Sequence, residues 1–225
     1  MSNDINHDYI VDYIRGVLPD RGGVCAEIEK TVEEDYFPIV EKETAALLEV
    51  MCQALCPQAI LEIGTAVGYS AILMKTATGP KTKITTIERY ERAADLAVRN
   101  IERAGFAQNI EVVLGDAADI LPSMNGQYDL IFLDAAKGQY PYFLQHLVRV
   151  LKPRGMLICD NVLYKGMTAE NTLVIRRKKT IVKRLRMFLD AITHHEQLTT
   201  CIIPMGDGLT ISIKRPEGVG GEESE

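Results

Sequence analysis

Two kinds of apolar pattern alternate along the chain, and together they predict its architecture. From residue 59 onwards, short continuous apolar runs, which are typical of buried strands, alternate with segments whose apolar positions recur at helical spacing. This alternation predicts a parallel sheet with helices on both faces. The expected strands are 59–64, 83–88, 110–115, 128–134 and 155–160, and the expected helices between them are about 68–78, 90–104, 117–121 and 140–151.

The end of the chain departs from this rhythm. Residues 199–204 and 209–214 both have strand-like patterns, and only Met205-Gly206-Asp207-Gly208 separates them. So short a link permits a hairpin but not a crossover helix, so one of the two strands should run antiparallel. The sequence therefore predicts an α/β fold with a seven-stranded, mostly parallel, Rossmann-like sheet and an antiparallel closing hairpin.

Three helical patterns precede the first strand, near residues 9–18, 25–34 and 43–55. They carry no chemical signature, and we expect them to cover one end of the sheet or to form a dimer contact. Residues 1–215 should form a single domain in which residues 1–56 are a helical cap. The Gly- and Glu-rich tail, residues 216–225, is expected to be disordered.

The composition, with 47% hydrophobic and 25% charged residues, is that of an ordinary soluble globular protein. No apolar run is long enough to span a membrane and the N-terminus lacks the pattern of a signal peptide, so we expect a cytoplasmic protein without a membrane partner. The five cysteines form no C-x-x-C motif, which favours buried, reduced thiols over zinc sites or disulfides.

The net charge of −6 conceals an asymmetry. The segment Arg176–Arg186 (RRKKTIVKRLR) contains seven basic residues and no acid, so the rest of the chain holds 18 basic and 31 acidic residues. An acidic body with one concentrated basic segment differs from a surface of mixed charge. On a helix, this segment and the residues after it would form one apolar stripe and expose most of the basic side chains. The expected stripe is Ile181, Leu185, Phe188, Leu189 and Ile192.

The stretch Ala59–Met74 (AILEIGTAVGYSAILM) has the composition of a cradle for a nucleotide-containing cofactor. An apolar strand that contains Glu62 runs into Gly64 and Gly68, and a helix follows from Ser70. A strand, a glycine turn and a helix N-terminus together direct backbone N–H groups and a positive dipole end at one place. Glycines that serve packing alone are the simpler explanation. The spacing G-x-x-x-G differs from the G-x-G-x-x-G of dinucleotide-binding oxidoreductases, so an oxidoreductase is a weak alternative.

Polar residues follow each of the first five predicted strands. Glu88 ends the second strand, 24 residues after Gly64, where a carboxylate can accept hydrogen bonds from ribose hydroxyls. Asp116 and Ala117 follow the third strand, where a carboxylate and a backbone N–H can bind the amino edge of an adenine. A single acid in such a place is often only a helix N-cap. Five successive strands that end in polar groups at one edge are not explained by capping.

The fourth and fifth strands end in residues suited to a hard cation. Asp134, Asp160 and Asn161 offer only oxygen ligands, which suit Mg²⁺. Lys137 lies three residues after Asp134. An amine close to a divalent cation and a cationic cofactor loses its proton more readily, so Lys137 is a candidate general base. The alternative is an ordinary lysine on a surface loop.

These residues stand in motifs that resemble those of a known family. The segments LEIGTAVGYSA, IER, GDAADILP, YDLIFLDAAKGQYPYF, RGMLICDNVLYKG and PMGDGLTISIK are similar to the cation-dependent O-methyltransferases, which include the catechol and caffeoyl-CoA O-methyltransferases. The resemblance covers roughly residues 35–215 and implies the class I S-adenosylmethionine-dependent methyltransferase fold. Within the family, a short chain with a basic penultimate helix is most similar to the bacterial tRNA 5-hydroxyuridine methyltransferases.

The resemblance also implies a set of ligands and roles. It implies a homodimer, Mg²⁺ on Asp134, Asp160 and Asn161, and Lys137 as the base. Asp134 would serve both the metal and the cofactor. The residues implied to hold S-adenosylmethionine are Val40, Glu62, Gly64, Ser70, Glu88, Asp116, Ala117 and Asp134, with Val40 resting on the segment 38–43 alone.

The basic segment bears on the substrate. Phosphates bound there would belong to a tRNA anticodon loop, whose unstacked bases can enter a pocket, or to a coenzyme A thioester. The chain is thus a tRNA wobble-uridine O-methyltransferase, a small-molecule catechol or phenylpropanoid O-methyltransferase, or an RNA-docking protein without catalysis. The first alternative requires tRNA to contact the basic side chains Arg176, Arg177, Lys179, Lys183 and Arg184.

Overall fold

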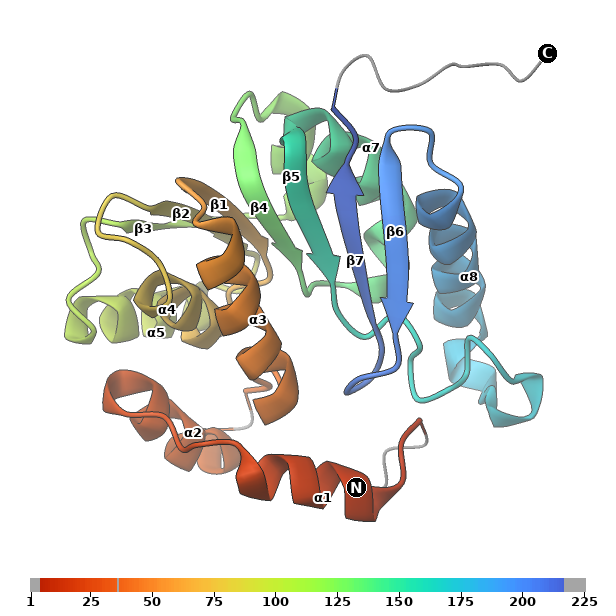
Figure 1. Cartoon of the computed structure of the whole chain (residues 1–225), viewed down its shortest axis with the longest axis horizontal. Helices are drawn as coiled ribbons and strands as arrows, with labels where there is room; N and C mark the ends of the chain where they lie inside the picture. The colour runs from red at the N-terminus through yellow and green to blue at the C-terminus, as the bar shows by residue number, and fades with distance from the viewer. Residues whose placement is uncertain (1–4, 36, 217–225) are drawn as a thin grey trace.

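The computed structural model describes residues 5–35 and 37–216, so most of the predicted disordered tail lies outside the described residues (Figure 1). Seven strands form one sheet in the order β3-β2-β1-β4-β5-β7-β6. The first five strands are parallel, and β7 pairs antiparallel with both β5 and β6, as predicted. The strands are β1 (Ala59–Ile63), β2 (Lys83–Glu88), β3 (Ile110–Leu114), β4 (Tyr128–Leu133), β5 (Leu151–Cys159), β6 (Leu198–Ile203) and β7 (Leu209–Lys214).

Helices cover both faces of the sheet, and the predicted helices are confirmed to within a few residues (Figure 1). The helices are α1 (Asp8–Val17), α2 (Gly23–Asp35), α3 (Lys42–Leu55), α4 (Tyr69–Thr76), α5 (Glu91–Arg103), α6 (Ala117–Ile120), α7 (Tyr140–Val150) and α8 (Lys179–Thr193). Among the described residues, none of these helices is long and apolar enough to cross a membrane.

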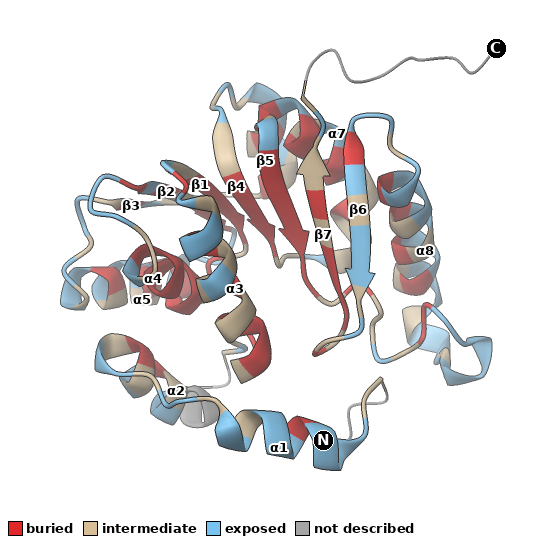
Figure 2. Ribbon diagram, in the orientation of Figure 1, coloured by how far each residue is buried: buried red, intermediate tan, exposed pale blue. Residues whose placement is uncertain are grey.

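The central strands are buried on both faces, because alternate side chains of a strand point to opposite sides of the sheet. Phe132 of β4 belongs to the core shared with α3, α4 and α5, whereas its neighbours Ile131 and Leu133 belong to the core shared with α7 and α8. Figure 2 shows that β4 and β5 are buried toward their carboxyl ends, over residues 130–133 and 155–159. This double burial explains why the parallel strands are nearly unbroken apolar runs in the sequence.

Two details differ from the sequence prediction. The basic segment does not form a helix throughout, because Arg176–Lys178 is a separate 3-10 turn, named η4, and α8 begins only at Lys179. The buried face of α8 includes Val182, which the predicted stripe left out, whereas Ile181 and Leu189 are only partly buried. The buried stripe is therefore shifted around the helix toward Val182, which lines a surface pocket together with Asn171 and Val174 of the segment before α8.

The prediction of uniformly buried thiols is also wrong in part. Cys25, Cys52 and Cys159 are buried, but Cys56 and Cys201 are exposed, and all five are free thiols. β6 is an edge strand, and the hydroxyl of Thr200 donates to the carbonyl oxygen of Ile192 in α8. Cys201 therefore points to the opposite face of the sheet, which α8 does not cover.

The carboxyl ends of the parallel strands meet at one edge, and α1 and α2 lie beyond this edge (Figure 1). Backbone hydrogen bonds continue past the strand ends and fix the residues that follow. Asp134 N donates to Ile63 O at 2.9 Å, and Asp160 N donates to Leu133 O at 2.9 Å. Residues predicted to carry chemistry are thus attached directly to the rigid part of the sheet.

Candidate active site

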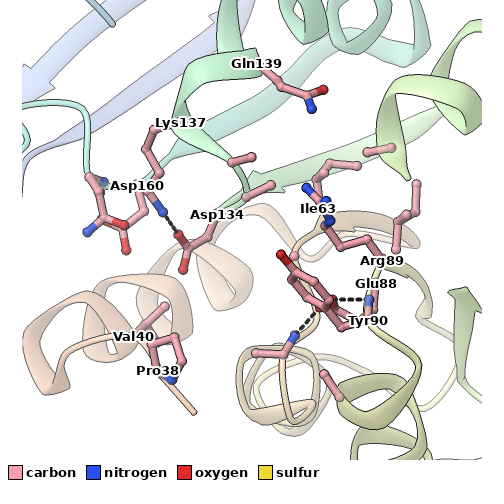
Figure 3. A pocket seen from close by; sticks show the side chains of 18 of the residues that line it. Pro38, Val40, Ile63, Glu88, Arg89, Tyr90, Asp134, Lys137, Gln139 and Asp160 are labelled. Carbon is pink, nitrogen blue, oxygen red and sulfur yellow. Dashed lines mark hydrogen bonds and ion pairs between the residues drawn. The ribbon is translucent and has the colours of Figure 1, made fainter. Parts of the chain in front are cut away.

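A cavity of about 590 Å³ opens at the carboxyl ends of β1, β2, β3, β4 and β5 (Figure 3). The segment 37–41, between α2 and α3, closes its other side. Most of the candidate site residues come together here. Those that line the cavity are Val40, Gly64, Glu88, Asp116, Ala117, Asp134, Lys137, Asp160 and Asn161.

Gly64 permits the closest backbone contact of the site. Its φ is +103°, and a Cβ atom there would lie 2.0 Å from the carbonyl oxygen of Asp134. No other residue fits, because both the conformation and the space exclude a side chain. This close approach joins the ends of β1 and β4.

The carboxylate of Glu88 is held by the backbone on both oxygens. Ala66 N donates to Oε2 and Tyr90 N donates to Oε1, each at 2.9 Å. Glu88 is only 6% exposed, so the carboxylate has a fixed orientation at the cavity wall. In Figure 3 it lies beside Arg89 and Tyr90 on one side of the cavity, and Asp134 and Lys137 lie on another.

Asp116 has the N-cap role that often explains an acid after a strand. Its Oδ1 accepts a hydrogen bond from Ala118 N at 2.9 Å, at the start of α6. The second oxygen lies 3.9 Å from Nη1 of Arg89. Because a carboxylate oxygen can accept more than one hydrogen bond, capping leaves Asp116 able to bind a ligand in the cavity it lines.

Glu62 and Ser70 are buried and do not line the cavity. The Thr86 hydroxyl donates to Glu62 Oε2 at 2.5 Å, and the hydroxyls of Thr65 and Thr86 lie 2.5 Å apart. Burial raises the pKa of Glu62 to about 7, against the opposing effect of Ser70 and Thr86. Glu62 is thus linked to Thr65 of the glycine turn through the Thr86 hydroxyl, and Ser70 bonds to Glu62, so both predicted cofactor residues support the turn from its buried side.

The two carboxylates of Asp134 and Asp160 share one side of the cavity with a single ammonium group. Lys137 Nζ lies 2.5 Å from Asp134 Oδ1 (Figure 3). Asp160 is 4% exposed, and its Oδ1 accepts a hydrogen bond from Asn161 N at 2.6 Å. Burial raises the pKa of Asp160 well above its ordinary value, the charge of Asp134 adds to this shift, and Lys137 opposes it.

This donor set fits a hard divalent cation. Two carboxylates and the amide of Asn161 line the same cavity, and all three side chains offer oxygen. One ammonium cannot neutralise two carboxylates, so a cation would relieve the repulsion that raises the pKa of Asp160. The third protein ligand would have to be the amide of Asn161, because the described part of the chain contains no group of three or more His, Cys, Asp or Glu side chains placed to hold a metal.

Tyr140 connects the two strands that carry these acids, and the sequence analysis did not single it out. Its buried hydroxyl lies 3.2 Å from Leu133 O and 3.0 Å from Asp160 O, so it donates to the end of either β4 or β5. Its ring packs edge-to-face on Phe188 of α8, with 5.3 Å between ring centroids. In the sequence, the only signal for this role is a tyrosine among apolar residues at the start of a helix.

The cavity wall contains further residues that sequence reasoning missed. Arg89 lies over the ring of Tyr90 at 4.9 Å, and Arg92 lies over the ring of Phe37 at 5.6 Å. The sequence signal for these residues was weak, because an arginine or an aromatic residue after a strand end has no fixed role. The missed lining residues include Phe37, Pro38, Arg89, Tyr90, Gln139 and Phe143.

The basic side chains lie outside the cavity lining. The side chains of Arg176, Arg177, Lys179 and Lys183 are exposed and make no hydrogen bond or ion pair to any described residue. Arg184, by contrast, donates from Nη1 to Gly138 O at 3.1 Å, next to Lys137. The basic segment is therefore separated from the cavity by the turn that carries Lys137.

Comparisons with known proteins agree with this fold. Residues 24–215 match the family model described as O-methyltransferase. The sheet order, the closing hairpin and the strand-end cavity define a class I methyltransferase fold. The chain belongs to the O-methyltransferase family.

The relatives differ in how much of their length is matched. A catechol O-methyltransferase from Mycobacterium tuberculosis is 34% identical over 128 residues, which cover 56% of this chain and 58% of that enzyme, less than two thirds of its length. A caffeoyl-CoA O-methyltransferase from Stellaria longipes is 26% identical over 91% of this chain and 88% of that one. The crystal structure of an O-methyltransferase from Bacillus cereus in complex with SAH has a TM-score of 0.81 and 26% identity, covering 92% of this chain and 97% of that one.

The contact at Gly64 gives a first prediction. Gly64→Ala should lower the free energy of unfolding by more than about 2 kcal/mol, because it adds both a strained φ and an overlap with Asp134 O. Urea denaturation measures this change. Gly79→Ala is the control, since a Cβ there meets nothing within 4 Å, and it should stay within about 0.5 kcal/mol of the wild type. Equal stabilities of the two variants would contradict the contact.

The raised pKa of Glu62 gives a second prediction. A carboxyl whose pKa rises from 4.5 unfolded to about 7 folded binds its proton more tightly in the folded state, so its contribution to stability is lost as pH rises through 7. Between about pH 5 and pH 8 the wild type should lose about 2.5 kcal/mol relative to Glu62→Gln, which cannot titrate. Urea denaturation across this range measures the difference. Parallel pH profiles would show that Glu62 keeps an ordinary pKa.

Proposed function

We propose that the cavity binds S-adenosylmethionine and Mg²⁺, and that the protein transfers the methyl group to a hydroxyl oxygen. The observation that carries this proposal is the joint placement of two sets of groups in one cavity. Glu88 and Asp116 suit a nucleoside, and Asp134, Asp160, Asn161 and Lys137 suit a cation and a hydroxyl acceptor. Family membership and the SAH complex of a relative also favour it.

The cofactor would be bound mainly by rigid groups. Glu88, fixed by two backbone N–H groups, accepts hydrogen bonds from the ribose hydroxyls, and Asp116 with Ala117 binds the adenine. The turn at Gly64 presents backbone to the amino-acid part, and Val40 of the segment 37–41 covers it. Glu62 and Ser70 act from below, by holding the turn. Such preorganisation lowers the entropic cost of binding.

The reaction would take place between Lys137 and the acidic pair. Asp134, Asp160 and Asn161 would hold the metal ion. When bound, Mg²⁺ supplies positive charge that favours ionisation of the acceptor hydroxyl, and the sulfonium of S-adenosylmethionine supplies the electrophilic methyl group. In its neutral amine form, Lys137 accepts the hydroxyl proton, and the acceptor oxygen bonds to the methyl carbon as the carbon–sulfur bond breaks and S-adenosylhomocysteine leaves. The residues contribute mainly by orienting the reactants.

For the acceptor, we favour 5-hydroxyuridine at the wobble position of tRNA, which would become 5-methoxyuridine. The support is a set of exposed side chains that make no hydrogen bond or ion pair to the described residues, namely Arg176, Arg177, Lys179 and Lys183. They belong to the same segment as Arg184, which bonds to the turn that carries Lys137. Unpaired cations on an otherwise acidic protein are expected to bind phosphates. A tRNA anticodon loop brings both phosphates and unstacked bases to such a surface. Cytoplasmic location and a homodimer are further expectations of this function.

A second candidate is a catechol or caffeoyl-CoA type of acceptor, which the names of the relatives favour. The phosphates of coenzyme A would also suit the basic side chains, but a free catechol would not use them. An RNA-docking protein without catalysis remains the third alternative. It predicts that loss of Asp134 or Lys137 leaves the protein's function unchanged.

Methyl transfer from labelled S-adenosylmethionine tests the reaction. With tRNA from a strain that lacks this gene, label should enter the tRNA with Mg²⁺ and not with EDTA. Lys137→Met should lower kcat by about 10²- to 10⁴-fold, because the proton acceptor is lost. Lys81→Met, an exposed lysine outside the cavity lining, should leave kcat unchanged. Label that enters only a free catechol would select the second candidate. Full activity of Lys137→Met would refute the role of Lys137 as general base.

Salt dependence tests the acceptor. The double variant Lys179→Gln/Lys183→Gln should bind tRNA more weakly, and the slope of log affinity against log salt should decrease by about 1.5 between about 50 and 200 mM. Lys81→Gln/Arg99→Gln removes two exposed charges elsewhere and should keep the wild-type slope. Fluorescence anisotropy with labelled tRNA measures both slopes. Identical slopes for the two variants would contradict phosphate binding at α8.

A further inference from the structure

One face of α8 packs on the turn that carries Lys137. This turn is the 3-10 element η2 (Lys137–Gln139), which joins β4 to α7. Three residues of α8 at helical spacing, Ile181, Arg184 and Phe188, approach this segment. Arg184 Nη1 donates to Gly138 O at 3.1 Å, and a methyl group on Gly138 would lie 4.0 Å from Ile181 Cγ1. Phe188 packs on the ring of Tyr140.

The two ends of this segment are held in different ways. At its far end, the fully buried Tyr140 donates to the end of either β4 or β5 and cannot move independently of the sheet. At its near end, Lys137 is partly exposed, and its ammonium contacts only Asp134 among the described side chains. Between them, Gly138 has no side chain with which to pack. Its backbone carbonyl is the group by which α8 can hold the middle of the turn.

Arg184 differs in this respect from the other cations of the basic segment. Lys183, its neighbour in the sequence, is exposed and its ammonium has no hydrogen-bond partner among the described residues, whereas the Arg184 guanidinium makes a directional bond to backbone. Arg186 makes two such bonds on the other flank of α8, to Thr168 O and Met167 O. A planar guanidinium suits such contacts better than a flexible ammonium does. The basic segment therefore contains arginines that bind the protein itself.

We propose that Arg184 is a positioning residue, which holds the turn at Gly138 and thereby fixes Lys137 relative to Asp134. The sequence pattern placed Arg184 among the residues that contact the acceptor; its geometry gives it a different task. This inference rests on the proposed function in one respect, namely that Lys137 accepts the proton. A small misplacement of a reacting group is enough to slow a reaction that depends on orientation.

Arg184→Gln and Lys183→Gln form a matched pair, because the residues are adjacent, both exposed, and carry the same charge. Arg184→Gln should lower kcat about tenfold and leave the KM of the tRNA acceptor and the affinity for S-adenosylhomocysteine unchanged. Lys183→Gln should raise the KM for tRNA and leave kcat unchanged. If Arg184→Gln raises only the KM, Arg184 is a phosphate contact and the proposal is wrong.

Hydrogen exchange gives a readout that does not depend on any methyl acceptor. In Arg184→Gln the amides of the peptide 134–143 should exchange faster, whereas Lys183→Gln should match the wild type. Faster exchange confined to Arg184→Gln supports the positioning role of Arg184 even if no acceptor is methylated. Failure of the proposed function can therefore be distinguished from failure of this inference. Equal exchange in the two variants overturns the proposal. Urea denaturation of both variants checks that global stability is the same.

Discussion

The contact between Gly64 and the backbone of Asp134 is the constraint on which the rest of the site depends. A side chain at residue 64 would occupy the position of the Asp134 carbonyl oxygen, so the ends of β1 and β4 can only meet at a glycine. This contact fixes Asp134 directly, and it fixes Lys137 and Asp160 through their contacts with Asp134 and Tyr140. It also turns the chain toward Ala66, whose N–H holds Glu88. One steric fact thus places both the wall with Glu88 and the wall with Asp134.

Electrostatics then give the site its chemical character. Burial of Asp160 beside Asp134 disfavours two negative charges, and a single ammonium at Lys137 compensates only one of them. A fold that needed only stability would not keep such a pair, because unneutralised buried charge is costly. The arrangement is that of a site built to receive positive charge. The four cations in η4 and α8 whose side chains bond to no described residue have the opposite character, and they suit a polyanionic acceptor, as proposed above.

The sequence predicted the strands and the polar residues at their ends because both follow from local patterns. Runs such as 128–134 mark buried parallel strands, and the carboxyl ends of such strands must share one edge. Glu62 and Ser70 were harder to place, because only the packed structure shows that they lie below the turn and not in the cavity wall. Arg184 and Lys183 are equivalent in any pattern of charges, and only the position of Gly138 distinguishes them. Tyr140 and Val182 likewise acquire their roles from neighbours distant in the sequence.

The most direct test of the account is a crystal structure with S-adenosylhomocysteine and Mn²⁺, which replaces Mg²⁺ and gives an anomalous signal. We expect the nucleoside between Glu88 and Asp116, and an anomalous peak coordinated by Asp134, Asp160 and Asn161. A nucleoside bound outside this cavity, or a peak absent from these three side chains while Mn²⁺ is in excess, would contradict it.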